Sequence, residues 1–169
     1  MEALRIESSI QTCFAHGSAY WGQSTMHIQQ RHLLLVEEDI TLSDITAFRL
    51  ELLGYAVEAV PSAEDALVSL ERRRPDLILL DLHQPGMSGL EFIEQLTRDE
   101  STNTIPIMAI AIDADLESVQ KAHKAGAVDY LVAPYDPTVL EEKVARQLER
   151  SSAPPATPTR PALALGRRT

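Results

Sequence analysis

The most informative segment of the chain is Pro75-Asp76-Leu77-Ile78-Leu79-Leu80-Asp81, which continues directly into Leu82-His83-Gln84-Pro85-Gly86-Met87-Ser88-Gly89. Its unbroken apolar run predicts a central strand that helices cover on both faces, because a half-exposed strand would alternate apolar and polar side chains. Ligands of open α/β sheets bind outside the carboxyl ends of the strands. Asp81, which ends this strand, is therefore a candidate functional residue.

A second short apolar run, His32 to Val36, ends in the three acids Glu37-Glu38-Asp39. Two central strands of one parallel sheet that both end in acids bring several carboxylates into one crevice. Such carboxylates raise one another's pKa unless a cation lies among them, and an all-oxygen cluster suits a hard ion such as Mg²⁺. The two strand ends together predict a divalent metal beside Asp81.

Length and composition indicate one soluble globular domain. The chain has 169 residues, of which 44% are hydrophobic and 24% charged, and this is an ordinary balance for such a domain. A single cysteine, Cys13, excludes an intramolecular disulfide and fits a reducing compartment. No apolar run approaches the ~20 residues that a membrane-spanning helix needs. We therefore expect a cytoplasmic protein that does not enter a membrane.

The charge of the chain is unevenly distributed. The formal net charge is -10, and residues 31–149 carry 10 basic against 23 acidic residues. Contacts with phosphate supply much of the affinity of nucleic-acid-binding proteins, so an acidic body argues against nucleic-acid binding by this domain. The expected partners are proteins.

Strand and helix patterns alternate five times along the chain. Strands alternating with helices over this length predict a parallel sheet flanked on both faces, with right-handed crossovers. In the helix that ends before Gly54, Ile45, Phe48 and Leu52 recur at helical spacing. The expected strands are His32–Val36, Tyr55–Val60, Pro75–Asp81, Ile105–Ile112 and Asp129–Val132, and the expected helices are Asp44–Leu53, Ala63–Arg73, Leu90–Arg98, Leu116–Ala125 and Thr138–Arg150.

The two ends of the chain lack a core-forming pattern. Residues 1–30 are expected to be a flexible N-terminal extension, and Met26, just ahead of the first strand, is an alternative translation start. Residues 151–169 are rich in Pro and Ala and are expected to be a disordered tail. The folded domain is expected to span residues 31–150.

Several of these motifs occur together in one known family. The acids after the first strand, Asp81, Pro85 with Gly89, and the segment Gly126-Ala127-Val128-Asp129-Tyr130-Leu131-Val132-Ala133-Pro134 resemble the receiver domain of bacterial response regulators over about residues 31–149. The resemblance implies a flavodoxin-like (βα)5 fold, a three-layer α/β sandwich with a parallel sheet of order 2-1-3-4-5. It also implies that Asp81 accepts a phosphoryl group.

The metal and switch residues follow from the same resemblance. Glu37, Glu38, Asp81 and the backbone carbonyl of His83 would hold Mg²⁺. Tyr130 occupies the place of the family's switch aromatic, on the face made by the fourth helix, fifth strand and fifth helix, through which the family also forms homodimers. The Ala133-Pro134 bond would be cis, as it is in the family.

The sequence departs from the family pattern around this site. Ala111 replaces the usual Ser or Thr at the end of the fourth strand, and Ala133 replaces a nearly invariant Lys before Pro134. Glu38 is one methylene longer than the usual Asp, and Gln84 replaces a common Met. Removing a charged group from such a site costs several kcal/mol of transition-state stabilisation, so we expect a weakened Mg²⁺ site and slow phosphorylation. With Ala111 in place of a hydroxyl, Tyr130 is expected to lie inward permanently.

Three functional hypotheses compete. The first is a stand-alone response regulator in a two-component phosphorelay, partnered by a sensor histidine kinase or another signalling protein and able at most to assist its own phosphorylation. The second is a degenerate receiver that serves as a phosphorylation-independent protein-interaction module. The third is a Mg²⁺-dependent phosphatase or a flavin-binding flavodoxin. The phosphatase would need an acid where His83 stands, and the flavodoxin would need a phosphate loop where Glu37-Glu38-Asp39 would repel phosphate.

Overall fold

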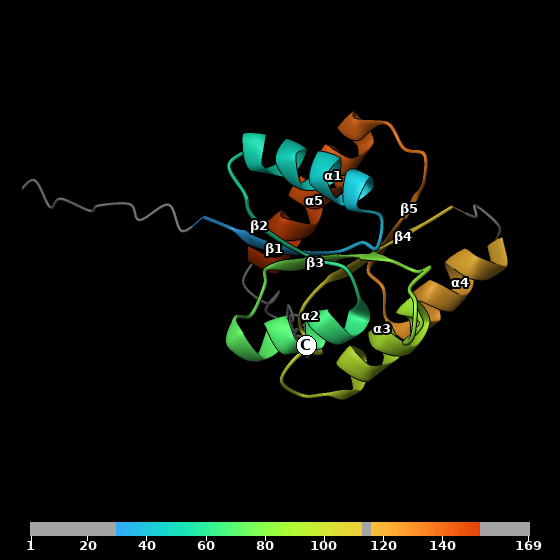
Figure 1. Cartoon of the computed structure of the whole chain (residues 1–169). Coiled ribbons are helices and arrows are strands. Elements are labelled where there is room, and N and C mark those ends of the chain that lie inside the picture. The colour runs from blue at the N-terminus through green and yellow to red at the C-terminus, as the bar shows by residue number, and fades with distance from the viewer. Residues whose placement is uncertain (1–29, 113–115, 153–169) are drawn as a thin grey trace, which may run out of the picture.

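Five strands and five helices alternate in the part of the chain that the structure, a computed structural model, describes, residues 30–112 and 116–152 (Figure 1). All neighbouring strands pair in parallel, in the order β2-β1-β3-β4-β5, and this confirms the predicted flavodoxin-like sheet. The elements are β1 (His32–Val36), α1 (Ile40–Leu52), β2 (Ala56–Val60), α2 (Ala63–Arg72), β3 (Leu77–Asp81), α3 (Gly89–Arg98), β4 (Ile107–Ala111), α4 (Leu116–Ala125), β5 (Asp129–Val132) and α5 (Pro137–Ser152).

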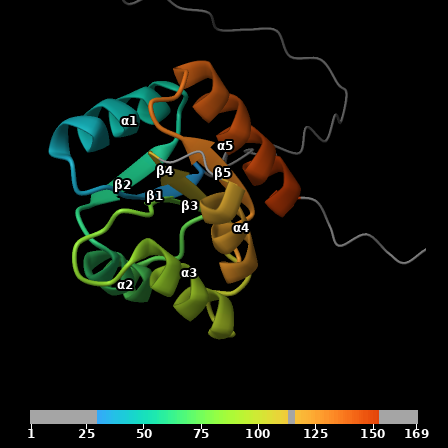
Figure 2. The same cartoon turned by 90° about the vertical axis from the view of Figure 1, so that its right-hand side faces the viewer.

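The sheet is the middle of three layers. Helices α1 and α5 cover one face, and α2, α3 and α4 cover the other (Figures 1 and 2). Every residue of β1 and β4 is buried, as is every residue of β3 before Asp81. Alternate side chains of these strands enter two separate cores, with Leu33 and Leu79 beneath α1 and α5 and Leu34 and Ile78 beneath the other three helices. The unbroken apolar runs thus mark strands that are covered on both faces.

Helix ends follow local capping chemistry. Ser62 and Asp136 each accept a hydrogen bond from a backbone N–H in the first turn of the following helix. A full capping box begins α3, where the Ser88 side chain accepts from the backbone of Glu91 and the Glu91 carboxylate accepts from the backbone of Ser88. These contacts fix the start of α3 directly after the loop that follows Asp81.

Helix α1 differs most from its predicted form. It begins at Ile40 rather than at Asp44, because Asp39 caps it. The residues that recur at helical spacing face solvent: the exposed fractions of Ile45, Phe48 and Leu52 are 60%, 63% and 71%. The periodicity therefore predicted the helix correctly but does not mark the side that packs on the sheet.

Some expectations lie outside the described residues. They are the flexible extension over 1–30, the alternative start at Met26 and the disordered tail over 151–169, nearly all of which fall in residues 1–29 and 153–169. Within the described ranges, no helix combines the length and the apolar character needed to cross a membrane.

Candidate functional site

The acidic ends of β1 and β3 lie side by side. The register pairs Val36 with Leu80, so the next residue of each strand, Glu37 and Asp81, emerges at the same carboxyl edge of the sheet. The Asp81 side chain is 18% exposed and Glu37 is half-buried. The structure thus brings together the two strand ends that the sequence predicts to form the site.

The loop after β3 folds back on Asp81. The backbone N–H of His83 donates to Asp81 Oδ1 at 3.0 Å, and the His83 Nδ1 atom lies 3.9 Å from the same oxygen. Burial raises the pKa of the Asp81 carboxyl above its usual value, and the negative charge of Glu38 adds to the rise, whereas the hydrogen bond from His83 opposes it. Asp81 is therefore a partly desolvated carboxylate with one oxygen held by the protein backbone.

Glu37 is held in a similar environment. Burial raises the pKa of the Glu37 carboxyl, and the charges of Asp81, Asp39 and Glu38 raise it further. Its Oε1 atom accepts a hydrogen bond from the backbone N–H of Asp39 at 3.1 Å, which partly offsets the rise. Glu38 itself is exposed at the rim. A cation placed among these carboxylates would relieve their mutual repulsion.

The third acid of the run, Asp39, has a structural role. Its Oδ1 atom accepts hydrogen bonds from the backbone N–H groups of Thr41 and Leu42 at 2.8 and 3.0 Å, which caps α1. The sequence alone does not distinguish this cap from a metal ligand, because an aspartate serves in both roles.

The donor set fits magnesium in its chemistry. Glu37, Glu38, Asp81 and the backbone carbonyl of His83 offer only oxygen ligands. No three His, Cys, Asp or Glu side chains in the described residues gather closely enough to hold an ion by themselves. Mg²⁺ usually keeps several waters and binds through one or two carboxylates, so it does not require such a preassembled cage. The residues present fit a water-rich Mg²⁺ site.

Two glycines and one distant glutamate shape the loop from Leu82 to Ser88. Gly86 has φ +75°, a conformation that favours glycine. A Cβ at Gly89 would lie 2.7 Å from the Leu82 Cα, so only glycine lets the start of α3 approach the end of β3. From α2, Glu64 Oε1 accepts a hydrogen bond from the backbone N–H of Met87 at 2.9 Å. No local pattern in the sequence indicates this contact, because the two residues are 23 positions apart.

The neighbouring strand ends carry methyl groups where the family resemblance predicts polar ones. Ala111 ends β4 and is 2% exposed, and the backbone N–H of Ala133 donates to its carbonyl oxygen at 2.8 Å. The Ala133-Pro134 peptide bond is cis. Neither alanine supplies a hydroxyl or an ammonium group to this edge of the sheet.

The side-chain amide of Gln84, in the same loop, has few opportunities to form hydrogen bonds. Both polar atoms of its side-chain amide are buried without a hydrogen-bond partner among the described residues. The family pattern places a methionine at this position, so the amide lies in a position suited to an apolar side chain.

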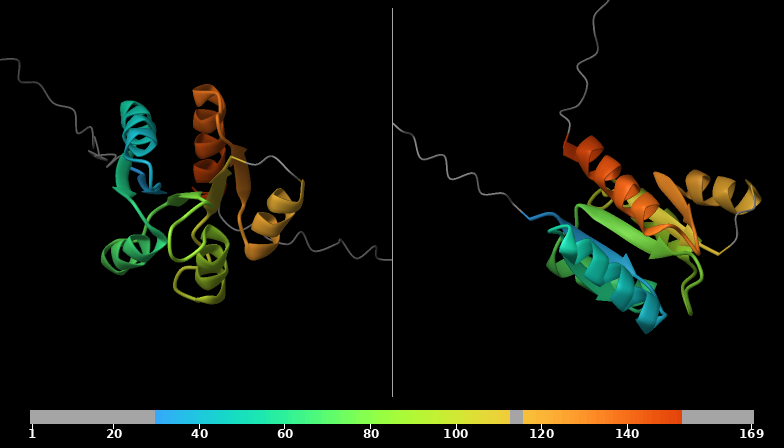
Figure 3. Two further views of the ribbon diagram at one scale, coloured as in Figure 1. Left: turned by 45° about the vertical axis from the view of Figure 1, so that its right-hand side comes forward. Right: turned by 90° about the horizontal axis from the view of Figure 1, so that it is seen from above.

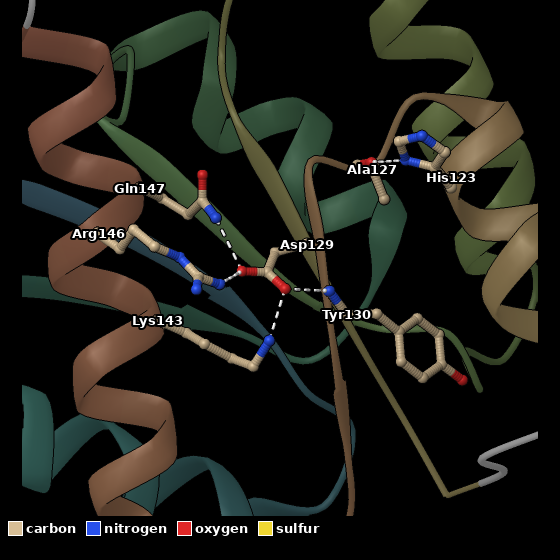
Figure 4. Close-up of polar contacts among 7 residues, drawn as sticks. All are labelled: His123, Ala127, Asp129, Tyr130, Lys143, Arg146 and Gln147. Carbon is tan, nitrogen blue, oxygen red and sulfur yellow. Dashed lines mark hydrogen bonds and ion pairs between the residues drawn. The ribbon is translucent and has the colours of Figure 1, made fainter.

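A polar cluster ties β5 to α5 (Figure 4). Lys143 Nζ and the backbone N–H of Tyr130 donate to Asp129 Oδ1 at 2.6 and 2.8 Å, whereas Arg146 and Gln147 donate to Oδ2 at 2.5 and 2.8 Å. Burial by itself raises the pKa of Asp129, but these hydrogen bonds outweigh it and lower that pKa to about 2. We call these residues the Asp129 cluster. In the sequence, the cluster is indicated only by the spacing of three polar residues, 143, 146 and 147, which places them on one face of a helix.

The switch candidate Tyr130 follows Asp129 in the chain. It is half-buried and packs against the core cluster that lies beneath α2, α3 and α4. The hypothesis that it lies inward permanently stays a prediction, because a single conformation does not test a switch.

Comparison with known proteins identifies the family. The family model described as "Response regulator receiver domain" matches residues 33–145. Transcriptional regulatory protein CseB of Streptomyces avermitilis is 35% identical over 134 residues, 79% of this chain and 56% of CseB. Phosphate regulon transcriptional regulatory protein PhoB of Pseudomonas aeruginosa is 32% identical over 119 residues, 70% of this chain and 52% of PhoB.

Solved structures agree with this match. A CheY-like response regulator receiver domain protein from Methanospirillum hungatei has a TM-score of 0.67 and 29% identity, covering 72% of this chain and 96% of that one. The chemotaxis response regulator CheY4 of Vibrio cholerae has a TM-score of 0.67 and 26% identity, covering 70% and 98%. The chain therefore belongs to the response regulator receiver domain family. It spans about half the length of the curated relatives it matches.

Proposed function

We propose that this receiver domain is a phosphorylation switch in a two-component relay, with Asp81 as the phosphoryl acceptor. The observation that carries the proposal is the position of the Asp81 carboxylate, 18% exposed at the end of β3 and next to Glu37 at the end of β1. A nucleophilic carboxylate has to be reachable by a phosphoryl donor and yet held in one orientation. The hydrogen bond from the His83 backbone to Oδ1 supplies that orientation.

Phosphoryl transfer depends mainly on positioning and on electrostatic stabilisation of the phosphoryl oxygens. Mg²⁺, when bound through Glu37, Glu38, Asp81 and the His83 carbonyl, would supply positive charge beside the transferred group. Partial burial of Asp81 keeps the carboxylate weakly solvated. The chain's own groups thus hold and orient the acceptor, while the donor supplies the phosphoryl group, so we regard the domain as a substrate and switch rather than an enzyme.

The alanines at 111 and 133 limit the rate of this reaction. In the family pattern a hydroxyl and a lysine assist at these two positions, and here both side chains are methyl groups. We expect phosphorylation to be slower than in receivers that keep both groups. A sensor histidine kinase would be the physiological donor, and the relatives' names, which describe transcriptional regulators, suggest an output through gene expression.

Phosphorylation from a small-molecule donor tests the proposal directly. The full chain is incubated with phosphoramidate or acetyl phosphate, with and without Mg²⁺, and its intact mass is measured. We expect one phosphoryl adduct that requires Mg²⁺ and is absent from the Asp81→Asn variant. No adduct, even after an incubation about 100-fold longer than an ordinary receiver needs for complete modification, would reject the proposal in favour of the phosphorylation-independent interaction module.

A further inference from the structure

Helix α1 exposes most of its large apolar side chains and buries two polar ones. The side facing the sheet contributes Ser43, Thr46 and Leu50 to the buried residues. The opposite side carries Thr41, Ile45, Phe48 and Leu52, all of them exposed, and we call these four residues the outer α1 stripe. Three of the four, Ile45, Phe48 and Leu52, are large apolar side chains, and such a row on a folded domain marks an interaction surface.

The spacing of the stripe is that of a coiled-coil seam. Successive members are four, three and four residues apart, so Ile45 and Leu52 take heptad positions a while Thr41 and Phe48 take positions d. A helix with this repeat packs against another helix by inserting each side chain between those of its neighbour. The pattern therefore fits an α-helical partner that runs along α1.

The charges beside the stripe select the partner and its direction. Asp44 precedes Ile45 at position g and Arg49 follows Phe48 at position e, and both are exposed. In a parallel pair of helices, position g of one helix lies against position e of the next heptad of the other, five residues further on. A second copy of α1, packed parallel and in register, would place Asp44 of each chain against Arg49 of its partner, twice across one two-fold axis.

An antiparallel pair would be repulsive by the same geometry. In an antiparallel pair, position g of one helix lies against position g of the other. Asp44 would then face Glu51 of the partner, because both residues lie at position g. Arg49 remains able to bridge two carboxylates: its Nε donates to Glu141 of α5 at 2.6 Å, and the guanidinium has four further N–H groups.

We propose that the outer α1 stripe is a homodimer interface in which two copies of α1 pack parallel and in register. This interface is separate from the one implied by the family resemblance, because α1 and α4 lie at opposite sides of the molecule (Figures 2 and 3). Parallel packing also places both Asp81 sites at the same end of the dimer. Four stripe residues per chain make a small interface, so the dimer is weak and depends on protein concentration.

Sedimentation velocity of the full chain over a range of concentrations tests the proposal. The 18.7 kDa monomer should give way to a species of twice that mass as concentration rises. The double variant Ile45→Ser/Phe48→Ser should remain monomeric with an unchanged melting temperature, because both side chains are exposed. Leu116→Ser on α4 is the matched control, since Leu116 is 72% exposed, and it should dimerise like the unmodified chain.

Charge variants test the direction of packing. Asp44→Arg should weaken the dimer by about tenfold or more, because it brings like charges together, whereas Asp44→Glu, which keeps the charge, should not. Glu51→Arg should have little effect in the parallel arrangement but should strengthen an antiparallel one, where it would meet Asp44.

Disulfide trapping supplies an independent readout. In a Cys13→Ser background, Leu52→Cys should cross-link to itself in the parallel dimer, whereas a mixture of Thr41→Cys and Leu52→Cys chains should give no mixed product. The proposal is overturned by a monomer at every concentration, by a dimer that survives Ile45→Ser/Phe48→Ser, or by the mixed 41–52 cross-link. The proposal is also overturned if the protein stays monomeric and its outer α1 stripe binds only a helix of a kinase.

Discussion

Glu64, at the start of α2, accepts a hydrogen bond from the backbone N–H of Met87 in the loop after Asp81, with 2.9 Å between Glu64 Oε1 and Met87 N. The two residues are 23 positions apart in the chain. A Cβ at Gly86 would lie only 2.6 Å from the same oxygen, so the Glu64 carboxylate packs closely against the loop. This contact holds the loop that carries His83, whose backbone N–H orients Asp81.

Replacing Glu64 with Ala should loosen that loop. Because the backbone N–H of Met87 loses its acceptor, we expect its hydrogen exchange to accelerate about fivefold, corresponding to one net hydrogen bond of about 1 kcal/mol. Phosphorylation of Asp81 should slow by a similar factor. Glu64→Gln is the matched control, since its amide oxygen still accepts from Met87. Equal exchange rates in the Ala and Gln variants would show that the contact does not order the loop.

Ala133→Lys should accelerate phosphorylation of Asp81 by a small-molecule donor. The change restores positive charge at the end of β5, and removal of one stabilising group from a comparable site costs about 100-fold or more in rate. We expect a gain of at least about tenfold, measured as the initial rate of adduct formation by intact mass. Ala133→Met adds similar length without charge. If Met accelerates the reaction as much as Lys does, the gain does not come from charge.

Asp129→Asn should destabilise the domain in a manner that depends on pH. The folded-state pKa lies near 2 against an ordinary 3.8, so the carboxylate contributes about 2 kcal/mol at neutral pH. This contribution is fully present above about pH 4 and is lost as pH falls toward 2, with about half gone at pH 3. Urea unfolding at pH 7 and at pH 3 measures this contribution as the difference in the free energy of unfolding between the unmodified chain and the variant.

A matched control for this series is Glu100→Gln, which removes an exposed charge. It should alter the free energy of unfolding by less than about 0.5 kcal/mol at either pH. A difference for Asp129→Asn that stays constant between pH 7 and pH 3 would refute the assignment of the low pKa to the Asp129 cluster.

Gln84→Met should stabilise the domain. The two polar atoms of the Gln84 amide are buried without partners in the described residues, and burying an unsatisfied polar group costs about 1–3 kcal/mol. We expect the melting temperature to rise by roughly 3–5 °C for each kcal/mol recovered. Gln84→Glu should lower it, because it places a charge in the same position. An unchanged melting temperature for Gln84→Met would mean that water satisfies the amide.

The parallel sheet could be predicted from the sequence because every central strand is covered on both faces, whereas the strand order followed from the resemblance to receiver domains. Such strands are continuous apolar runs, and the alternation with helices then leaves few topologies. The outward direction of the α1 stripe could not be predicted this way. Periodicity shows where apolar side chains recur, but Ser43 and Thr46 pack on the sheet from the opposite side of α1.

Contacts between distant residues explain what was missed at the site. The acids at the ends of β1 and β3 could be predicted to meet, because both follow strand ends. Glu64 and Met87 are 23 positions apart, and Asp129 is 14 or more positions from its partners on α5. The spacing of residues 143, 146 and 147 marks one polar face of α5, but no local pattern identifies Asp129 as the partner of that face. The capping role of Asp39 was missed because Asp39 follows Glu37 and Glu38, which are candidate metal ligands.

That cap separates helix formation from ion binding at this edge of the sheet. Asp39 satisfies the first backbone N–H groups of α1 within its own turn, at 2.8 and 3.0 Å. The first turn of α1 therefore needs no ion to be complete, and a cation can enter or leave beside Glu37 without melting the helix that starts three residues later. If the proposed Mg²⁺ binds at the acidic edge, its exchange there leaves the helix next to it a fixed part of the scaffold.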